Sequence, residues 1–329
     1  MSPALVLCFL ALCLPASLAA QTLAVALTEE NRVLLFDAAT YDSVASVPVG
    51  RAPHEIAASP DGRHLYVGNT GASGQPERLT VTRIDLARPT RTSEIEAGDC
   101  AGLHDLRVSR SGRLLWIACA QAPGVAEIDL ATKRVRRQWR TTLDGGWMLA
   151  ASPDERRIFV AHLEGQAVTV IDRERETVAT IPGPGPQYGI EVTPAGREVW
   201  VTAPDSARVT VLDAAGDSVL ATFPSAGAGP GRVGFTPNGR LAVIPHDEPP
   251  TLTLVDVASR TPVASIPLAA APKVLALSPD GRFAAVSHPE AKLVSIVDLE
   301  RRAVARTIAL PGTPDGVAYA AARAPPEAD

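Results

Sequence analysis

Five of the six histidines in this 329-residue chain stand at two fixed places in a repeated sequence. His54 and His104 lie five residues before a recurrent turn of the type Ser-Pro-Asp-Gly-Arg. His162, His246 and His288 lie ten residues before a recurrent aspartate. Imidazole side chains transfer protons near neutral pH, bind transition metals and hydrogen-bond to anionic ligands. Whether the five histidines form one site depends on where the repeat places these two positions.

The recurrent turn sets the period of the repeat. Its copies begin at Ser59, Ser109, Ser152, Thr193, Thr236 and Ser278, with spacings of 50, 43, 41, 43 and 42 residues. Proline fixes φ at the second position, Asp or Asn suits the third, and glycine accepts a left-handed backbone at the fourth. Such a turn joins two adjacent antiparallel strands.

A second column of residues shows how many repeats the chain contains. Strand-like segments such as "VTVID" end at Asp37, Asp85, Asp129, Asp172, Asp213, Asp256 and Asp298, one more than the number of turns. After the last of these, "LPGTPDGVAYA" matches "VGRAPHEIAAS" but stops before a turn, and "TLAVALTEENRVLLFD" near the N-terminus supplies the rest of that unit. We therefore predict an all-β fold, a seven-bladed β-propeller with four strands per blade. Its ring is closed by N- and C-terminal segments that share one blade.

The wording of the repeat also resembles a known family. The segments "LYVGNTG" and "LTVTRIDLA", after "VGRAPHEIAASPDGR", are similar to the YVTN-repeat family of bacterial seven-bladed β-propellers, a WD40-like architecture. The resemblance covers roughly residues 22–320 and implies a secreted or periplasmic propeller. Lactonase-type and haem d1-type propellers are similar in appearance. Only Asn69 keeps the asparagine of the motif, and the other copies have Leu27, Cys119, His162, Ala203, His246 and His288 there.

Both histidine columns are expected at one end of the propeller. In a four-stranded blade, the start of the first strand and the loop after the second strand lie at the same end. The two columns should therefore ring one mouth of the central channel, where they would bind a small ligand or a protein partner. The candidate ligand-binding residues are His54, His104, Trp147, Tyr188, Lys273, Asp315, His162, His246 and His288.

Two other interpretations of the histidines stay open. The mouth could belong to an enzyme, a hydrolase, lyase or oxidoreductase, with a transition metal held by His54, His104, His162, His246 and His288. Each metal ligand would then come from a different blade, because the sequence contains no HxH or HxxxH pair. Alternatively, each histidine only hydrogen-bonds to a neighbouring loop. The sequence requires no cofactor.

Charged residues also occur within the segments expected to line the channel. They are Glu55, Asp105, Arg107, Glu191 and Arg232. Because an unpaired buried charge is costly, we expect these side chains to pair across the channel wall. The alternative is that they line a binding tube.

The N-terminus and the cysteines indicate export. Residues 1–20 are uncharged, largely apolar and end in small residues, as a signal peptide does. The propeller would then span residues 21–322, followed by a disordered tail at 323–329. Cys100 and Cys119 remain in the same repeat of the mature chain, and we predict a disulfide between them. The alternative is a pair of thiolate ligands beside His104. Export implies a periplasmic or secreted protein.

The overall charge argues against one class of partner. Acidic residues number 36 and basic residues 31, so a broad nucleic-acid interface is not expected. We expect a monomer whose mature chain has no membrane span.

Overall fold

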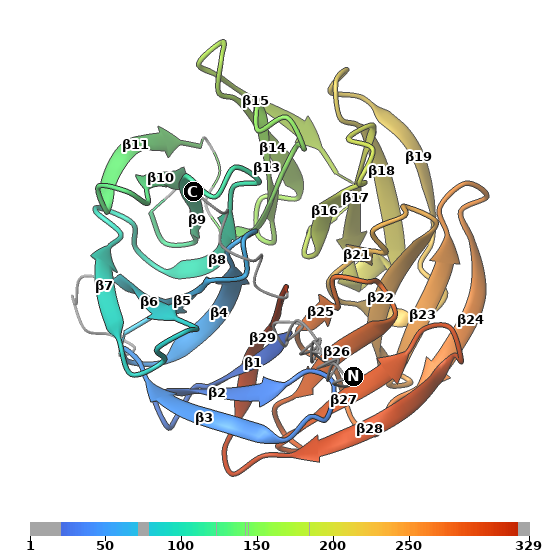
Figure 1. Cartoon of the computed structure of the whole chain (residues 1–329). Coiled ribbons are helices and arrows are strands. Elements are labelled where there is room, and N and C mark those ends of the chain that lie inside the picture. Colours follow the sequence, from blue (N-terminus) through green and yellow to red (C-terminus); the bar gives the residue numbers. More distant parts are fainter. Residues whose placement is uncertain are drawn as a thin grey trace, which may run out of the picture.

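Seven small β-sheets stand around a central axis in the computed structural model of the chain, and Figure 1 shows them as a ring of blades. The structure describes residues 21–71, 79–122, 124–141, 143, 145–183 and 185–321. The expected signal peptide and the expected tail lie outside them. In the described ranges, helix is limited to one short 3-10 turn, η1 (Pro204–Ser206), and no helix is long and apolar enough to span a bilayer. The predicted seven-bladed β-propeller is confirmed.

Blades 1 to 4 begin with the blade that the two ends of the chain share. Blade 1 contains β29 (Pro314–Ala320), β1 (Thr22–Leu27), β2 (Arg32–Asp37) and β3 (Ser43–Pro48). Blade 2 contains β4 (Pro53–Ala58), β5 (His64–Asn69), β6 (Thr80–Asp85) and β7 (Thr92–Glu96). Blade 3 contains β8 (Leu103–Val108), β9 (Leu114–Cys119), β10 (Gly124–Asp129) and β11 (Arg134–Arg140). Blade 4 contains β12 (Gly146–Ala151), β13 (Arg157–His162), β14 (Ala167–Asp172) and β15 (Thr177–Pro182).

Blades 5 to 7 complete the ring. Blade 5 contains β16 (Ile190–Val192), β17 (Glu198–Ala203), β18 (Arg208–Asp213) and β19 (Val219–Pro224). Blade 6 contains β20 (Ala228–Pro230), β21 (Gly234–Phe235), β22 (Leu241–Glu248), β23 (Thr251–Asp256) and β24 (Thr261–Pro267). Blade 7 contains β25 (Leu275–Leu277), β26 (Phe283–His288), β27 (Leu293–Asp298) and β28 (Ala303–Ala309). In blade 6 the innermost strand is broken, and both pieces pair with β22.

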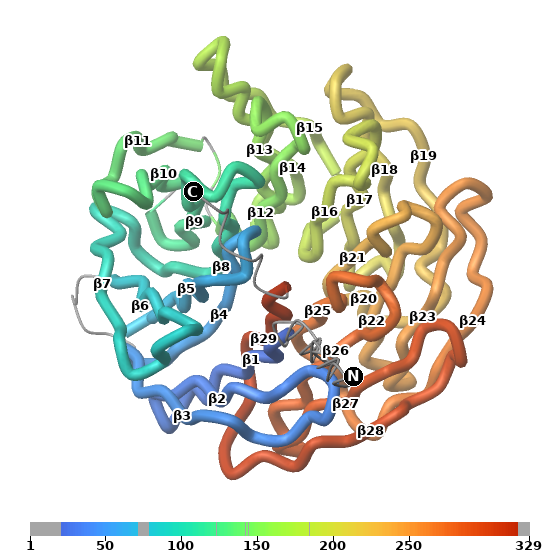
Figure 2. Tube along the Cα trace, viewed as in Figure 1, coloured from blue at the N-terminus to red at the C-terminus, as the bar shows by residue number. Residues whose placement is uncertain are grey.

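The ring is closed as the split repeat predicts. β29 at the C-terminal end pairs antiparallel with β1, so Thr22 lies opposite Ala320. Figure 2 shows the two ends of the described chain, red and blue, side by side in this blade. A shared blade removes the seam at which first and last blades would expose unpaired strand edges.

The recurrent sequence elements hold the strands in register by local hydrogen bonds. Ser59 Oγ donates to Asp61 Oδ1 at 2.5 Å and accepts the amide of His64 at 2.9 Å. Gly62 follows with φ of 66°, in the left-handed region that the motif reserves for glycine. After the third strand, the carboxylate of Asp129 accepts the amides of Ala131 and Thr132. The turn and the aspartate lie at the same end of each blade, since Leu114, the first residue of the strand after the turn of blade 3, pairs with Asp129.

Blades pack face to face, and their inner strands approach closely around the axis. Trp116 of blade 3 shares a buried apolar cluster with Leu149 and Ile158 of blade 4. At the axis, a Cβ on Gly316 would collide with the carbonyl oxygen of His54. Glycine at this position therefore lets blade 1 approach blade 2 closely enough for Asp315 to reach His54.

Candidate functional site

One end of the channel carries a continuous chain of side chains from five consecutive blades. Lys273 Nζ lies 3.0 Å from Asp315 Oδ2, and His54 Nδ1 lies 2.6 Å from the same oxygen. His54 Nε2 lies 3.4 Å from His104 Nε2. The ring of His104 packs on that of Trp147, with centroids 3.9 Å apart. We call these five residues the histidine mouth.

The strands place these side chains at one level because each precedes or begins an inner strand. Asp315 is buried, whereas His54, His104, Trp147 and Lys273 are half-buried and line the opening. Tyr188 stands at the same level of blade 5 and is also half-buried. The six candidates of the inner-strand column are thus brought to one end of the channel.

The electrostatics of the mouth distinguish its two histidines. Burial lowers the pKa of His54, but the hydrogen bond to Asp315 and the charges of Glu55 and Asp315 outweigh it, so this pKa is raised. Burial, and then the charges of His54 and Arg232, lower the pKa of His104 to about 2. A protonated His54 therefore donates from Nδ1 to Asp315 and from Nε2 to a neutral His104. With Lys273 present and one carboxylate, the mouth then carries a net charge of about +1.

Two kinds of chemistry fit this geometry differently. A carboxylate that hydrogen-bonds to an imidazole orients it as a general acid or base, and a cationic mouth beside an indole ring suits an anionic ligand. A metal fits less well. One ligand atom each of His54, Glu55 and Asp315 lies within 4.8 Å of the others. A cation there would have to displace Lys273 from Asp315 and Arg232 from Glu55.

The other three candidate histidines stand at the same end of their blades but are not part of the histidine mouth. His162 and His288 end the second strands of their blades, His246 lies two residues before the end of β22, and all three are fully buried. His162 Nε2 lies 2.8 Å from Thr169 Oγ1, and His288 Nε2 lies 2.9 Å from Ser295 Oγ. The structure does not bring these three histidines together with His54 and His104.

His246 and His288 fasten the loop that leads into the inner strand, here called the lead-in loop. His288 Nδ1 donates to the carbonyl oxygen of Ala270 at 2.8 Å, so its Nε2 accepts from Ser295. A Cβ on Gly227 would collide with the ring of His246, which packs directly beneath that residue. This is the loop contact that one of the sequence-based interpretations expected.

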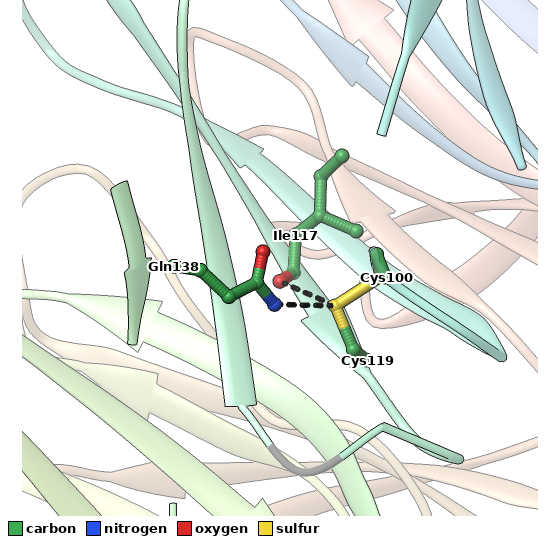
Figure 3. Close-up of a disulfide and its surroundings, with 4 residues drawn as sticks. All are labelled: Cys100, Ile117, Cys119 and Gln138. Carbon is green, nitrogen blue, oxygen red and sulfur yellow. Dashed lines mark hydrogen bonds between the residues drawn. A yellow bond between two sulfur atoms is a disulfide. The ribbon is translucent and has the colours of Figure 1, made fainter. Parts of the chain in front are cut away.

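The predicted disulfide occupies the same place in blade 3. Figure 3 shows Cys119, at the end of β9, bonded to Cys100 in the lead-in loop. Both cysteines are buried, and they are 19 residues apart in sequence. Asn69 packs beneath Gly50 at the same separation in blade 2. In blade 3 the disulfide therefore takes the place of a packing contact that Asn69 or His246 makes in other blades. The predicted disulfide is confirmed.

Removing this bond is expected to lower the free energy of unfolding by roughly 3 kcal/mol, because it closes a loop of about 20 residues in the unfolded chain. The measurement is urea unfolding of the oxidised protein and of the Cys100→Ala/Cys119→Ala variant. Wild-type protein reduced before unfolding should match the variant. Equal unfolding midpoints for oxidised and reduced wild-type protein would contradict the expectation.

A layer of paired charges crosses the channel directly beneath the histidine mouth. It consists of Glu55, Asp105, Arg107, Glu191 and Arg232, here called the charge layer. Arg232 hydrogen-bonds to Glu55 and lies 4.0 Å from Asp105, while Arg107 lies 3.5 Å from Asp105. Arg107 also lies 3.6 Å from Glu191. The expected pairing across the channel is thus present.

Arg232 stands at the same repeat position as Glu55 and Asp105, four residues before the recurrent turn, and the inner strand of blade 6 is interrupted around it. β20 ends at Pro230 and β21 begins at Gly234. Its partner Glu55 belongs to blade 2, which is not adjacent to blade 6 in the ring. The sequence identified the charged residues but gave no indication that the strand breaks here.

Fold and site together define a seven-bladed β-propeller with a polar, aromatic mouth at one end of its channel. No family model matches the chain, so its membership of the YVTN-repeat family stays a prediction. Among curated proteins, the chain is 31% identical over 179 residues to Protein NirF of Pseudomonas aeruginosa and 28% identical over 177 residues to Protein NirF of Stutzerimonas stutzeri. Each match covers 50% of this chain and 44% of the relative, so the chain spans less than half the length of these relatives.

Solved structures share the fold at lower identity. The periplasmic gluconolactonase PpgL of Pseudomonas aeruginosa has a TM-score of 0.74 and 21% identity, over 92% of this chain and 99% of that one. Kuenenia stuttgartiensis hydrazine synthase has a TM-score of 0.71 and 21% identity, over 82% and 89%. A functionally unknown protein from Desulfotomaculum acetoxidans has a TM-score of 0.77 and 14% identity, over 91% and 98%. At these identities the similarity concerns the fold alone.

Proposed function

We propose that the protein is an exported binding module that takes up a small planar anion at the histidine mouth. The observation that carries the proposal is the unbroken chain from Lys273 through Asp315, His54 and His104 to Trp147. It brings an ammonium group, a histidine whose pKa is raised and an indole ring to one half-buried opening. Charge-assisted hydrogen bonds and ring stacking would together recognise a carboxylate or phosphate on an aromatic or conjugated body.

Export is supported by two further findings. The Cys100–Cys119 disulfide suits an oxidising compartment, where such bonds persist. One structural neighbour with almost complete coverage is named as a periplasmic protein. Both findings support a periplasmic or secreted location.

The proposal is tested with two probes that share one ring system. 2-Naphthoate carries a carboxylate, whereas 2-naphthalenemethanol carries a hydroxyl group. We expect calorimetry to show at least tenfold tighter binding of the carboxylate, because a hydrogen bond to a charged group contributes about 1.5–3 kcal/mol. Lys273→Gln should weaken naphthoate binding about tenfold, and Trp147→Ala should weaken both probes about fivefold or more.

The sixth histidine provides the matched control. His64 lies on β5 and accepts a hydrogen bond from Arg83, away from the mouth. His64→Gln should leave naphthoate affinity within twofold of wild type. Equal affinities for the two probes, no binding of either at millimolar concentration, or insensitivity to both mouth variants would refute the proposal.

A further inference from the structure

A separate cavity of about 570 Å³ fills the channel on the other side of the charge layer. All seven blades contribute to its lining, which extends from the level of Glu55 to Pro194 and Pro237 in the recurrent turns. The cavity therefore opens on the face opposite the histidine mouth, and we call it the turn-face cavity. His54 and the other residues of the mouth do not line it.

The lining of the turn-face cavity combines charged and apolar residues. Its apolar members include Leu106, Ile190, Val233, Phe235, Leu275 and Val317, whose side chains pack largely into the cores between the blades. One column of inner-strand residues leaves the space open, since five blades have a small residue there: Ala57, Ala150, Gly234, Ala276 and Ala318. Blades 3 and 5 have Arg107 and Glu191 at this position instead. A concave volume of this size, lined by apolar residues and convergent charged groups, has the form of a small-molecule site.

The floor of the cavity is the charge layer, which contains three carboxylates and two guanidinium groups. Glu55 is hydrogen-bonded to Arg232. Asp105 accepts the amides of Leu106 at 2.9 Å and Leu149 at 3.0 Å. The floor therefore has an excess of one negative charge when all five groups are ionised.

Glu191 is the carboxylate that is held least tightly. Its Oε1 accepts only the amide of the next residue, Val192, at 3.1 Å. Its Oε2 lies 3.6 Å from Arg107, beyond hydrogen-bond distance, and 27% of the side chain is exposed to the cavity. Burial raises the pKa of Glu191, only partly offset by the charge of Arg107. A cationic group entering the cavity would stabilise this carboxylate.

We infer that the turn-face cavity is a second binding site, which takes an organic ammonium with an apolar body. The ammonium group hydrogen-bonds to Glu191 and balances the charge of the floor, while the body lies against the apolar part of the lining. The two ends of the channel thus have opposite preferences, the histidine mouth for anions and the turn-face cavity for cations. Arg110 is exposed at the rim of the cavity, so an anionic ligand is the alternative that the test must distinguish.

The test compares three probes with the same body: 4-phenylbutylammonium, 4-phenylbutyrate and 4-phenylbutanol, each titrated into the mature protein by calorimetry. We expect the ammonium to bind at least fivefold more tightly than the alcohol. Glu191→Gln, which keeps the size of the side chain, should weaken ammonium binding about tenfold or more. Trp147→Ala in the histidine mouth should leave it within twofold.

Filling the cavity locates the binding. Ala276→Phe places a ring in the cavity without altering any charge and should abolish ammonium binding, with the fold checked by circular dichroism. Ala57→Leu serves the same purpose if that variant does not fold. The inference would be overturned if 4-phenylbutylammonium still bound to both Ala276→Phe and Ala57→Leu, or bound equally well to Glu191→Gln. It would also be overturned if 4-phenylbutyrate bound more tightly than the ammonium and the two cavity-filling variants abolished that binding.

Discussion

Arg232→Met lowers the free energy of unfolding by about 3–5 kcal/mol, the largest effect that we expect from any single substitution in the channel. Arg232 is buried and is the hydrogen-bond partner of Glu55 across the ring. Its removal leaves the Glu55 carboxylate without a partner in a buried position, next to Asp105. Urea unfolding at neutral pH measures the loss.

A second substitution separates the effect of leaving Glu55 without its ion-pair partner from the effect of lost packing. In Arg232→Met/Glu55→Leu, both members of the buried pair are apolar, and most of the stability should return. Arg301→Met removes an exposed partner of Asp298 and should change the stability by no more than about 0.5 kcal/mol. If Arg232→Met were as mild as Arg301→Met, the charge layer would not stabilise the ring.

Acidification from pH 7 to pH 5 is expected to destabilise the protein markedly, because several histidines are held neutral in the folded state. Burial and neighbouring charges lower the pKa of His104 to about 2, and burial lowers the pKa of His246 and His288. Below pH 6.5 these histidines become protonated in the unfolded chain but stay neutral in the folded protein. The free energy of unfolding therefore falls as the pH falls. His104 alone accounts for a loss of about 2 kcal/mol over this interval.

His54 has the opposite effect on stability, and it acts in a different pH interval. His54 has a raised pKa, so its contribution is complete below pH 6.5 and is lost only as the pH rises through the folded-state value. Glu55 and Glu191, whose pKa values burial raises, take up protons on folding and reduce the net loss in acid.

The histidine contribution is isolated by substitution. His288→Asn introduces asparagine, the residue found at the equivalent position of blade 2 (Asn69). His104→Gln keeps an uncharged polar side chain. Unfolding free energies at pH 7 and pH 5 should differ less in the double variant than in wild type. An equal difference in both proteins would show that the neutral histidines do not govern acid stability.

The fold could be predicted in detail because each blade repeats its own boundary signals. The turn at Ser59 and the aspartate at Asp129 are stabilised by hydrogen bonds between residues no more than five apart, and such local interactions are readable from sequence alone. The disulfide could be predicted because the repeat places Cys100 and Cys119 at the same end of one blade, in a chain expected to be exported.

The candidate site could be predicted only in part. The inner-strand column correctly gathers His54, His104 and Asp315, because a strand start fixes the level of a side chain in the channel. Side-chain direction in the second column was not predicted, although a signal exists. His162 and His288 are each followed seven residues later by a hydroxyl residue, Thr169 or Ser295, which stands beside them on the next strand.

Two features depended on contacts between distant segments. The pairing of Arg232 with Glu55, 177 residues away in sequence, follows from no local motif. The turn-face cavity likewise arises from small residues contributed by several blades. Neither can be derived from one repeat alone.

The central claim is that a planar anion binds at the histidine mouth, and an NMR titration of ¹⁵N-labelled protein with 2-naphthoate tests it most directly. The chain has four tryptophans, of which Trp116, Trp139 and Trp200 are buried between strands. Our account predicts that naphthoate shifts the indole signal of Trp147, assigned with Trp147→Phe, and leaves the other three in place. Saturable binding with no change at Trp147 would contradict it.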